Sequence, residues 1–354
     1  MNLTGRFPTR LLVDLPTWVG DQVMALPAVR VLVDGNRGGD TVLHTTPAMR
    51  RLLELLFPEA RVAAARRKTS PFVSARALCG PGGRFELGVT LRNALRAKIL
   101  VRLAARSSVG SRGEGAMLLL SQRCVVDRAR HQVFDADTIL RALGLPGVDA
   151  AWRPRTPRSL VYEGRRALER AGVMEGGQVV GLAPATARAQ ARRWPADRFG
   201  RLARHLTERG LLPVVVVGPG EERLAEAVRR TATQDLPVVG PDLDVAALAG
   251  VLSGLDALVA NDSGPMHLAA LCGTPVVGLF GPSDPRRTAP LGRGHQVLNR
   301  HLVCSPCTAH RCPLGHQECL RSIAVDEVDA ALTKILVAKG SGIDHSPVAT
   351  LVSN

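Results

Sequence analysis

Short apolar runs alternate with amphipathic stretches along the first half of the chain. Strand-like runs occur at residues 10–15, 41–45, 61–65 and 86–91. After the first run and a Pro/Gly turn, apolar residues recur at helical spacing, at Val23, Leu26, Val29 and Val31. Strands that alternate with helical crossovers predict a parallel sheet with an α/β fold.

The second half repeats the alternation more regularly. Strand-like runs lie at residues 179–183, 211–217, 257–260 and 275–280. One predicted helix carries its apolar face at Phe199, Leu202, Ala203 and Leu206. We expect this helix to end at Gly210, a second to follow residues 218–220, and a third to begin after Asp244 as its N-cap. A second parallel sheet is therefore predicted.

A proline-rich stretch separates the two halves. Residues 144–158 contain three prolines and no clear periodicity. A chain of 354 residues is long enough for two domains, so we predict domains at residues 1–155 and 156–340. Residues 341–354 have no pattern and are expected to be a frayed tail.

Composition narrows the class of partner. Hydrophobic residues make up 45% and charged residues 22%, which is typical of a globular protein. The net charge of +15, mostly from arginine, favours an anionic partner. With 3% aromatic residues the chain lacks the stacking surfaces that bind single-stranded nucleic acid, which leaves an anionic substrate or a lipid headgroup.

No sequence segment predicts a membrane span or a signal peptide. The longest apolar runs are shorter than the roughly 20 residues that cross a bilayer. Asp14 and Asp21 interrupt the apolar stretch at residues 11–29, and no small-residue cleavage site follows it. We therefore expect a cytoplasmic protein.

The strongest local motif is at residues 257–270, where a strand, a tight turn and a helix with Pro265 at its first position are predicted. The free N–H groups of a first helical turn and the positive end of its dipole suit a diphosphate. Ser263, Gly264 and His267 lie where they can add donors. The alternative is that Asp262 or Ser263 caps the helix and that His267 packs against a neighbour.

Four ordered motifs resemble the ADP-heptose:lipopolysaccharide heptosyltransferase family, glycosyltransferase family 9. They are the donor loop with residues 278–285, the N-terminal segment 15–28, Arg193-Trp194-Pro195, and the Cys-rich segment 304–316. The resemblance covers roughly residues 10–335. Within the family, the chain looks most like the second heptosyltransferase of the inner core.

This resemblance implies a GT-B fold, in which two Rossmann-like domains with parallel sheets face each other across a cleft. The N-terminal domain would bind the acceptor, through loops such as residues 66–83 and 102–115, and the C-terminal domain would bind the nucleotide sugar. The reaction would invert the anomeric carbon and require no cofactor or catalytic metal. Asp21 matches the family's catalytic base, although it could also be an N-cap after Gly20.

The resemblance also implies the donor-binding residues. Arg192 stands where the family usually has a lysine and would stabilise the leaving diphosphate. Thr186 matches a hydroxyl that contacts the donor, and Glu222 or its neighbour Glu221 would bind the ribose, unless both are first-turn helix acids. The donor loop itself contributes Asp262, Ser263, Gly264, Pro265, Met266 and His267.

Four of the seven cysteines cluster, at Cys304, Cys307, Cys312 and Cys319. With His310 and His316 nearby they could enclose a structural zinc, although the spacing is not that of a standard zinc finger. The remaining Cys79, Cys124 and Cys272 are expected to be small buried hydrophobic residues.

The leading hypothesis is transfer of L-glycero-D-manno-heptose from ADP-heptose to a heptose or Kdo of the lipopolysaccharide core. The enzyme would be peripheral at the cytoplasmic face of the inner membrane, with an anionic lipid-linked oligosaccharide as acceptor and no nucleic-acid partner. A second hypothesis keeps this chemistry but changes the acceptor to a protein, a secondary metabolite or another glycan. A third is a nucleotide-binding module without catalysis, against which Asp21 beside an intact donor loop argues.

Overall fold

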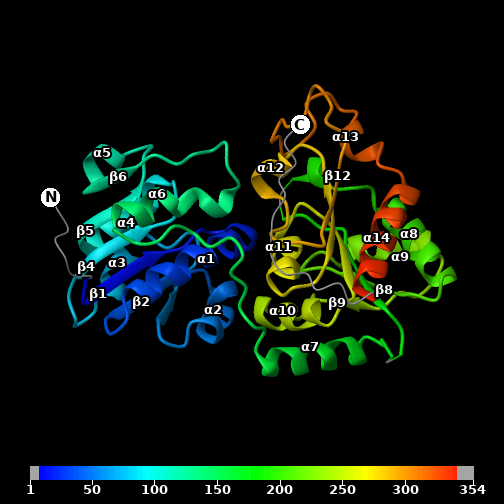
Figure 1. Ribbon diagram of the computed structural model, residues 1–354, viewed down its shortest axis with the longest axis horizontal. Coiled ribbons are helices and arrows are strands. Elements are labelled where there is room, and N and C mark those ends of the chain that lie inside the picture. Colours follow the sequence, from blue (N-terminus) through cyan, green and yellow to red (C-terminus); the bar gives the residue numbers. More distant parts are fainter. Residues whose placement is uncertain (1–7, 175, 188, 341–354) are drawn as a thin grey trace. The chain divides into compact units, whose positions relative to one another are not determined.

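The structure is a computed structural model that describes residues 8–340, except residues 175 and 188. The chain divides into two compact units, Met1–Trp152 (unit 1) and Arg153–Asn354 (unit 2) (Figure 1). The tail expected at residues 341–354 lies outside the described residues. No helix in the described part of the chain is both long and apolar enough to cross a bilayer.

Unit 1 contains a six-stranded parallel sheet in the order β3-β2-β1-β4-β5-β6. The strands are β1 (Arg10–Asp14), β2 (Asp40–Thr45), β3 (Arg61–Ala64), β4 (Phe85–Thr90), β5 (Ala105–Ser111) and β6 (Gln122–Cys124). The order reverses direction between β1 and β4. In open α/β sheets, ligands bind beyond the carboxyl ends of the strands at such a switch point.

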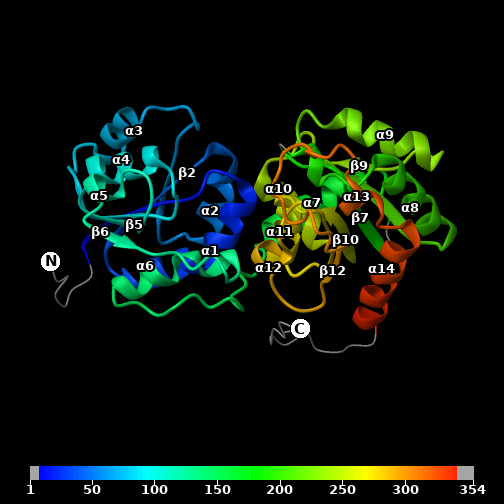
Figure 2. The same cartoon turned by 90° about the horizontal axis from the view of Figure 1, so that it is seen from above.

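Helices cover both faces of this sheet. They are α1 (Val19–Gly35), α2 (Arg50–Leu56), α3 (Pro71–Cys79), α4 (Leu95–Ala104), α5 (Ala116–Leu119) and α6 (Asp137–Ala142), with short 3-10 turns at Pro47–Met49 and Gln132–Ala136. Figure 2 shows α3 and α4 on one side of the sheet and α1 and α6 on the other. The apolar face predicted for α1 is buried at Val23, Leu26 and Val29, but Leu32 rather than Val31 completes it.

Unit 2 repeats the same topology, with a parallel sheet in the order β12-β11-β10-β7-β8-β9. The strands are β7 (Val179–Ala183), β8 (Leu212–Val216), β9 (Val238–Val239), β10 (Ala257–Asn261), β11 (Val276–Phe280) and β12 (Gln296–Asn299). Here the order reverses between β7 and β10, so the loops after these two strands flank the switch point.

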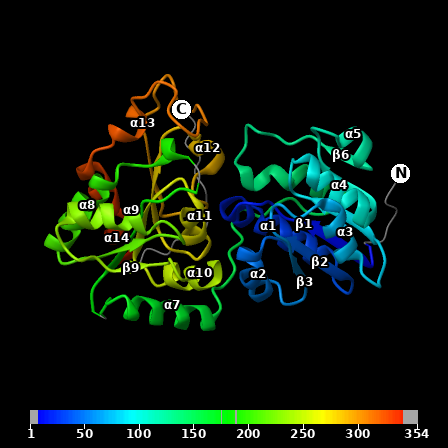
Figure 3. The same ribbon diagram turned by 180° about the vertical axis from the view of Figure 1, so that it is seen from behind.

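The helices of unit 2 also form two layers. They are α7 (Arg158–Arg170), α8 (Ala196–Glu208), α9 (Glu222–Ala232), α10 (Val245–Ser253), α11 (Gly264–Leu271), α12 (Pro285–Thr288), α13 (Glu318–Arg321) and α14 (Val325–Gly340), with a 3-10 turn at Gln190–Arg192. Figure 3 shows α8, α9 and α14 grouped on one side of the sheet and α7, α10 and α11 on the other. The predicted core face of α8 is buried, and Gly210 after it has a φ of 76° that favours glycine.

All the strands predicted from the apolar runs are present, but β5, β6, β9 and β12 were not predicted. Consequently, the expectation of a loop at residues 102–115 holds only for residues 112–115, because the end of α4 and all of β5 occupy the rest; its contact with an acceptor stays a prediction. The sequence of β5 is rich in serine and glycine, and pairing with β4 and β6 makes it a strand. Residues 66–83 include α3 as well as loop.

Candidate functional site

The turn between β10 and α11 lies at the switch point of unit 2. Ser263 is the N-cap residue, with extended backbone at φ −155° and ψ 170°, and its side chain makes no capping hydrogen bond. The helix begins at Gly264, so Pro265 is its second residue and not its first as predicted. The first N–H groups of a helix have no partner within it, so this turn offers donors to an anion.

Three ionisable side chains meet at this turn. Asp262 is 4% exposed; its Oδ2 lies 3.1 Å from Nη1 of Arg192 and its Oδ1 lies 3.7 Å from Nε2 of His267. Burial alone would raise the pKa of Asp262, but His267 and Arg192 more than offset it and hold that pKa below its ordinary value. Asp262 is therefore an ionised anchor that fixes Arg192 and His267 beside the helix N-terminus.

Two buried polar atoms at this turn have no hydrogen-bond partner within the described residues. They are Oγ of Ser263 and Nε of Arg192, whose side chain is 34% exposed. Leaving such a group unsatisfied costs about 1–3 kcal/mol. Oxygens of a bound diphosphate could satisfy both. The sequence left open that the side chain of Asp262 or Ser263 caps the helix, and no such capping hydrogen bond is present at this turn.

Two other predicted donor residues have side chains engaged within the protein. Met266 is fully buried, so only its backbone can meet a ligand. The hydroxyl of Thr186 donates to the carbonyl of Ala189 at 2.9 Å and accepts from Nε of Arg193 at 3.2 Å. Thr186 therefore shapes the loop after β7, and its contact with a donor stays a prediction.

Glu221 and Glu222 lie at the N-terminus of α9. Glu221 is the N-cap residue, and its Oε2 accepts from the N–H of Gly218 at 2.8 Å. Oε1 of Glu222 accepts from the N–H of Gly220 at 3.1 Å. The backbone N–H groups of Glu222 itself and of Gly220 lower the pKa of Glu222. Glu222 is thus a first-turn acid of α9, as the alternative expected, whereas Glu221 precedes the first turn; Glu222 is the more exposed of the two.

Asn261 organises this site and was not predicted from the sequence. Its side chain is fully buried; Nδ2 donates to the carbonyl of Pro184 at 2.8 Å and Oδ1 accepts from the N–H of Trp194 at 2.9 Å. It thereby ties the end of β10 to both ends of the loop that carries Arg192. A buried amide at a strand end, directly before the donor turn, is the signal that could have indicated this role.

Gln317 was also missed. Its Nε2 lies 3.0, 3.2 and 3.0 Å from the carbonyl oxygens of Gln190, Ala191 and Arg193. These carbonyls flank Arg192 on the 3-10 turn Gln190–Arg192. Gln317, directly after the Cys-rich segment, therefore supports the loop that presents Arg192.

The four clustered cysteines line one pocket. Within the described residues, no group of three or more His, Cys, Asp or Glu is arranged to hold a metal ion, and the structural zinc stays a prediction. Cys304 and Cys307 are exposed, whereas Cys319 is buried. Backbone N–H groups, that of Gln317 first, lower the pKa of the Cys312 thiol instead.

The three scattered cysteines behave partly as expected. Cys124 is buried, whereas Cys79 and Cys272 are half-buried. Burial raises the pKa of all three thiols, that of Cys272 to about 11. They are therefore poor nucleophiles at neutral pH.

In unit 1, Asp21 is the third residue of α1 and lies beyond the carboxyl end of β1. The N-cap is Trp18, so the N-cap alternative for Asp21 is wrong. Nε2 of Gln132 donates to Oδ1 of Asp21 at 3.0 Å. The half-buried carboxylate lines an open cavity, together with Leu91, Arg112 and other residues of unit 1; its volume is about 980 Å³ when the solvent space at its mouth is included. Asp21 thus stands at the β1/β4 switch point, with room for a sugar.

The comparison with known families is decisive for the class of protein. Residues 75–318 match the family described as glycosyltransferase family 9 (heptosyltransferase). The chain belongs to this family. It is therefore a glycosyltransferase, as the ordered motifs predicted.

Individual proteins that are similar to this chain support the same family assignment. Lipooligosaccharide heptosyltransferase 2 of Campylobacter jejuni is 23% identical over 335 residues, which cover 92% of this chain and 99% of that protein. The structure of Escherichia coli ADP-heptose LPS heptosyltransferase II superposes with a TM-score of 0.77 at 22% identity, covering 94% and 99% of the two chains. A family 9 glycosyltransferase of Veillonella parvula gives 0.82 at 19% identity with the same coverage. These structures confirm the predicted GT-B type of fold with two parallel sheets.

Proposed function

We propose that this glycosyltransferase moves L-glycero-D-manno-heptose from ADP-heptose to a heptose or Kdo of nascent lipopolysaccharide core, with inversion at the anomeric carbon. The main support is the donor turn of unit 2, where the N-terminus of α11, the free Oγ of Ser263 and the Asp262-anchored Arg192 converge. The names of the Campylobacter and Escherichia relatives support heptose as the sugar.

In this reaction, the diphosphate of the donor binds at the N-terminus of α11. Arg192 and the backbone N–H groups of the first turn stabilise the negative charge that develops on the leaving ADP. His267 takes part through Asp262 or by direct contact with phosphate, and Glu222, or Glu221, binds the ribose. Thr186, Gly264, Pro265 and Met266 shape the loops around the diphosphate. The donor domain is residues 156–340.

Asp21 acts as the general base. It accepts the proton of the acceptor hydroxyl while that oxygen attacks the anomeric carbon from the face opposite the diphosphate, and the bond to ADP breaks. Gln132 holds one carboxylate oxygen and leaves the other available. The chemistry requires no metal, because cationic and N–H groups carry the charge stabilisation.

The acceptor is an anionic lipid-linked oligosaccharide that binds to residues 1–155. The net charge of +15 supports this proposal and a peripheral position at the cytoplasmic face of the inner membrane, because both the acceptor and the lipid surface are acidic. Transfer to a protein, a secondary metabolite or another glycan would keep the donor site and change only these contacts.

Nucleotide release tests the proposal. The protein is incubated with a truncated core acceptor and either ADP-heptose or UDP-sugars, and we expect acceptor-dependent release of ADP from ADP-heptose alone. Release from UDP-sugars alone would rule out heptose as the sugar. ADP should also raise the melting temperature of the protein, and His267→Ala should reduce that shift if His267 contacts phosphate.

The role of Asp21 has its own test. Asp21→Asn keeps the shape of the side chain but removes the base, so kcat should fall by about 10²- to 10⁴-fold while the ADP-induced shift in melting temperature is retained. A normal turnover rate in this variant would contradict the base assignment. Retained ADP binding without transfer in the wild-type protein would favour the non-catalytic alternative.

A further inference from the structure

Unit 1 exposes a group of large apolar side chains on three of its helices. Phe72 and Val73 lie in the first turn of α3, Leu95 is the first residue of α4, and Met117 and Leu118 lie in α5. All five are exposed, Met117 by 81% and Leu118 by 88%. We call this group the apolar rim. Single apolar residues are common on protein surfaces, whereas a group of them marks an interaction site.

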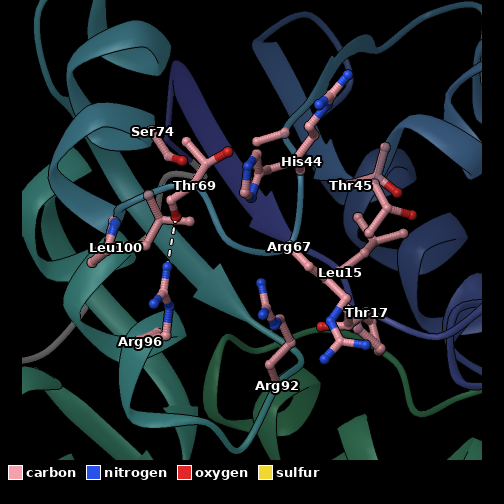
Figure 4. A pocket seen from close by; sticks show the side chains of 15 residues that line it. Leu15, Thr17, His44, Thr45, Arg67, Thr69, Ser74, Arg92, Arg96 and Leu100 are labelled. Atoms are coloured by element: carbon pink, nitrogen blue, oxygen red, sulfur yellow. Dashed lines mark hydrogen bonds between the residues drawn. The ribbon is translucent and has the colours of Figure 1, made fainter.

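The starts of the three helices adjoin one another. Nη2 of Arg96, in the first turn of α4, donates to the carbonyl of Thr69 at 2.7 Å, just before α3 (Figure 4). Leu95 contacts the turn before α5, because its Cδ1 lies 2.4 Å from the place that a Cβ on Gly115 would occupy. Figure 2 shows α3, α4 and α5 next to one another. The apolar rim is therefore one surface.

The opposite faces of the same helices supply a core. Ala75 of α3, Leu100 and Val101 of α4 and Ala116 of α5 belong to one cluster of buried hydrophobic residues. The core of unit 1 thus accounts for one face of each helix and leaves the apolar rim in solvent. Only a second molecule can remove the rim from water.

Positive charge borders the apolar rim. Segments 71–80, 92–104 and 112–118 contain six Lys or Arg and a single acidic residue, Glu114. Exposed Arg76 follows Phe72 by one helical turn, and exposed Arg102 follows Leu95 by two turns. A long arginine side chain lies along an apolar surface while its charge stays at the polar interface. An apolar surface with a cationic border is complementary to a bilayer that contains anionic lipid.

The apolar rim lies beside the cavity that Asp21 lines. Asn93 and Gly113, in the loops after β4 and β5, line that cavity, and these loops lead directly into α4 and α5. Val125, another exposed apolar residue, lines the cavity as well. A bilayer at the apolar rim would bring the cavity to the surface from which a lipid-linked sugar comes. This position favours a bilayer over a protein as the occupant.

We propose that the apolar rim is the surface by which unit 1 docks to an anionic bilayer. Its five side chains enter the interface between headgroups and acyl chains, and Arg76, Arg96 and Arg102 bind the lipid phosphates. The inference rests on the proposed function in that the acceptor is lipid-linked. Attachment requires both parts, because a small apolar surface alone binds a membrane weakly and exposed charge alone is screened by salt.

Vesicle binding tests this surface in the full-length protein. The double variants Phe72→Ser/Val73→Ser and Met117→Ser/Leu118→Ser remove apolar surface and leave the core intact, because all four side chains are exposed. In sedimentation with vesicles of phosphatidylcholine and phosphatidylglycerol at low ionic strength, we expect the partition constant to fall roughly 10- to 100-fold in each variant. A partition constant equal to that of the wild type in both variants would overturn the proposal.

A matched control lies in unit 2. Val161→Ser/Tyr162→Ser makes the same change at two exposed apolar residues of α7. This variant should bind the vesicles as tightly as the wild type. An equal loss of binding in the control would mean that apolar surface acts without regard to its place, and it would overturn the assignment to the apolar rim.

Tryptophan fluorescence reports insertion directly. Brominated acyl chains quench a tryptophan that lies within the bilayer, so vesicles of brominated lipid should quench Leu118→Trp more strongly than the wild type, which has three tryptophans. Tyr162→Trp, in unit 2, should be quenched no more than the wild type. Absence of additional quenching in Leu118→Trp would place the apolar rim outside the bilayer and overturn the proposal.

Sedimentation velocity without vesicles decides between a bilayer and a second copy of the chain. We expect the wild type and both rim variants to have the same sedimentation coefficient. A wild-type dimer that both rim variants abolish, together with unchanged vesicle binding, would assign the apolar rim to self-association and overturn the proposal.

Transfer assays separate this inference from the proposed function. With a water-soluble truncated acceptor, the rim variants should keep the turnover of the wild type, whereas transfer to an acceptor anchored in vesicles should be slower. Normal heptose transfer to both acceptors, with unchanged vesicle binding, overturns the docking surface and leaves the function intact. No heptose transfer by the wild type, with vesicle binding lost in the rim variants, refutes the function and retains the docking surface.

Discussion

At the scale of single residues, the proposed donor site contains a buried charge. Asp262 is almost fully buried, yet Arg192 and His267 keep its pKa below the ordinary value. A buried carboxylate without partners would show the opposite shift. The ionised form therefore holds Arg192, whose Nε remains available to a ligand.

This ionisation predicts a dependence of stability on acid. Because the folded-state pKa of Asp262 is lowered from about 3.8, the residue stabilises the fold above that value, and the stability is lost as pH falls through the lowered pKa. In urea unfolding, the free energy of unfolding should fall less between pH 5 and pH 2 for Asp262→Asn than for the wild type. That variant should nevertheless be less stable at pH 7 by about 1–3 kcal/mol.

Asp235→Asn, at a side chain that is 92% exposed, is the control and should follow the wild type. Parallel curves for wild type and Asp262→Asn would contradict the assignment.

At the scale of elements, two helices of unit 2 pack through glycines. A Cβ on Gly250 in α10 would lie 1.9 Å from the carbonyl oxygen of Leu160 in α7, and one on Gly164 would lie 2.0 Å from the backbone of Gly250. The backbones of α7 and α10 therefore touch (Figure 3). No flexible side chain is available there to move aside.

Gly250→Ala should consequently destabilise unit 2. Alanine favours an isolated helix over glycine by about 1 kcal/mol, but the clash forces α7 away from α10, and we expect a net loss of about 1–3 kcal/mol in the free energy of unfolding. Gly254→Ala, at the end of the same helix, is the control, because its nearest neighbour would lie 3.4 Å away. Equal stabilities of the two variants in thermal unfolding would exclude close packing of the helices.

The residue directly after the Cys-rich segment has a structural role that the sequence did not indicate. Gln317 donates to backbone carbonyls on both sides of Arg192. Gln317 has a positive φ of 52°. Asparagine tolerates that conformation but is one methylene shorter.

Gln317→Asn should therefore loosen the Arg192 loop without straining the backbone. We expect a smaller increase in melting temperature on addition of ADP, and a melting temperature without ADP that changes by only a few degrees. Gln234→Asn, at a half-buried glutamine that bonds to Thr207, serves as a control and should keep the full ADP effect. A full ADP effect in Gln317→Asn would mean that Arg192 is positioned by other contacts.

The sequence predicted those parts of the fold and site that local patterns encode. Apolar runs gave β1 to β4, β7, β8, β10 and β11, and the turn chemistry gave the Asp244 cap, which accepts from the N–H of Ala247 at 2.7 Å. The serine- and glycine-rich β5 was missed because pairing with its neighbours, rather than its own composition, makes it a strand. The links through Asn261 and Gln317 join residues more than sixty positions apart, so no local pattern reveals them.

At the scale of the whole molecule, the two units share one strand order, and each carries proposed site residues at its switch point. Asp21 follows β1 in unit 1, while Arg192 and Asp262 follow β7 and β10 in unit 2. The same topological rule thus accounts for the positions of the proposed base in one unit and of the proposed anion site in the other. The high positive net charge, in contrast, is a property of the whole chain.

The net charge of +15 predicts binding to acidic membranes that depends on salt. Exposed charges are screened beyond a Debye length of about 10 Å at 0.1 M salt, whereas a partly buried diphosphate site is screened much less. In sedimentation with vesicles that contain anionic lipid, we expect most of the protein to bind at low ionic strength and to be released by about 0.5 M NaCl.

Vesicles of zwitterionic lipid are the control and should bind little protein at either salt concentration. The ADP-induced shift in melting temperature, measured over the same salt range, should change far less. Binding to both kinds of vesicle that persists in high salt would instead indicate an apolar attachment and contradict the electrostatic one.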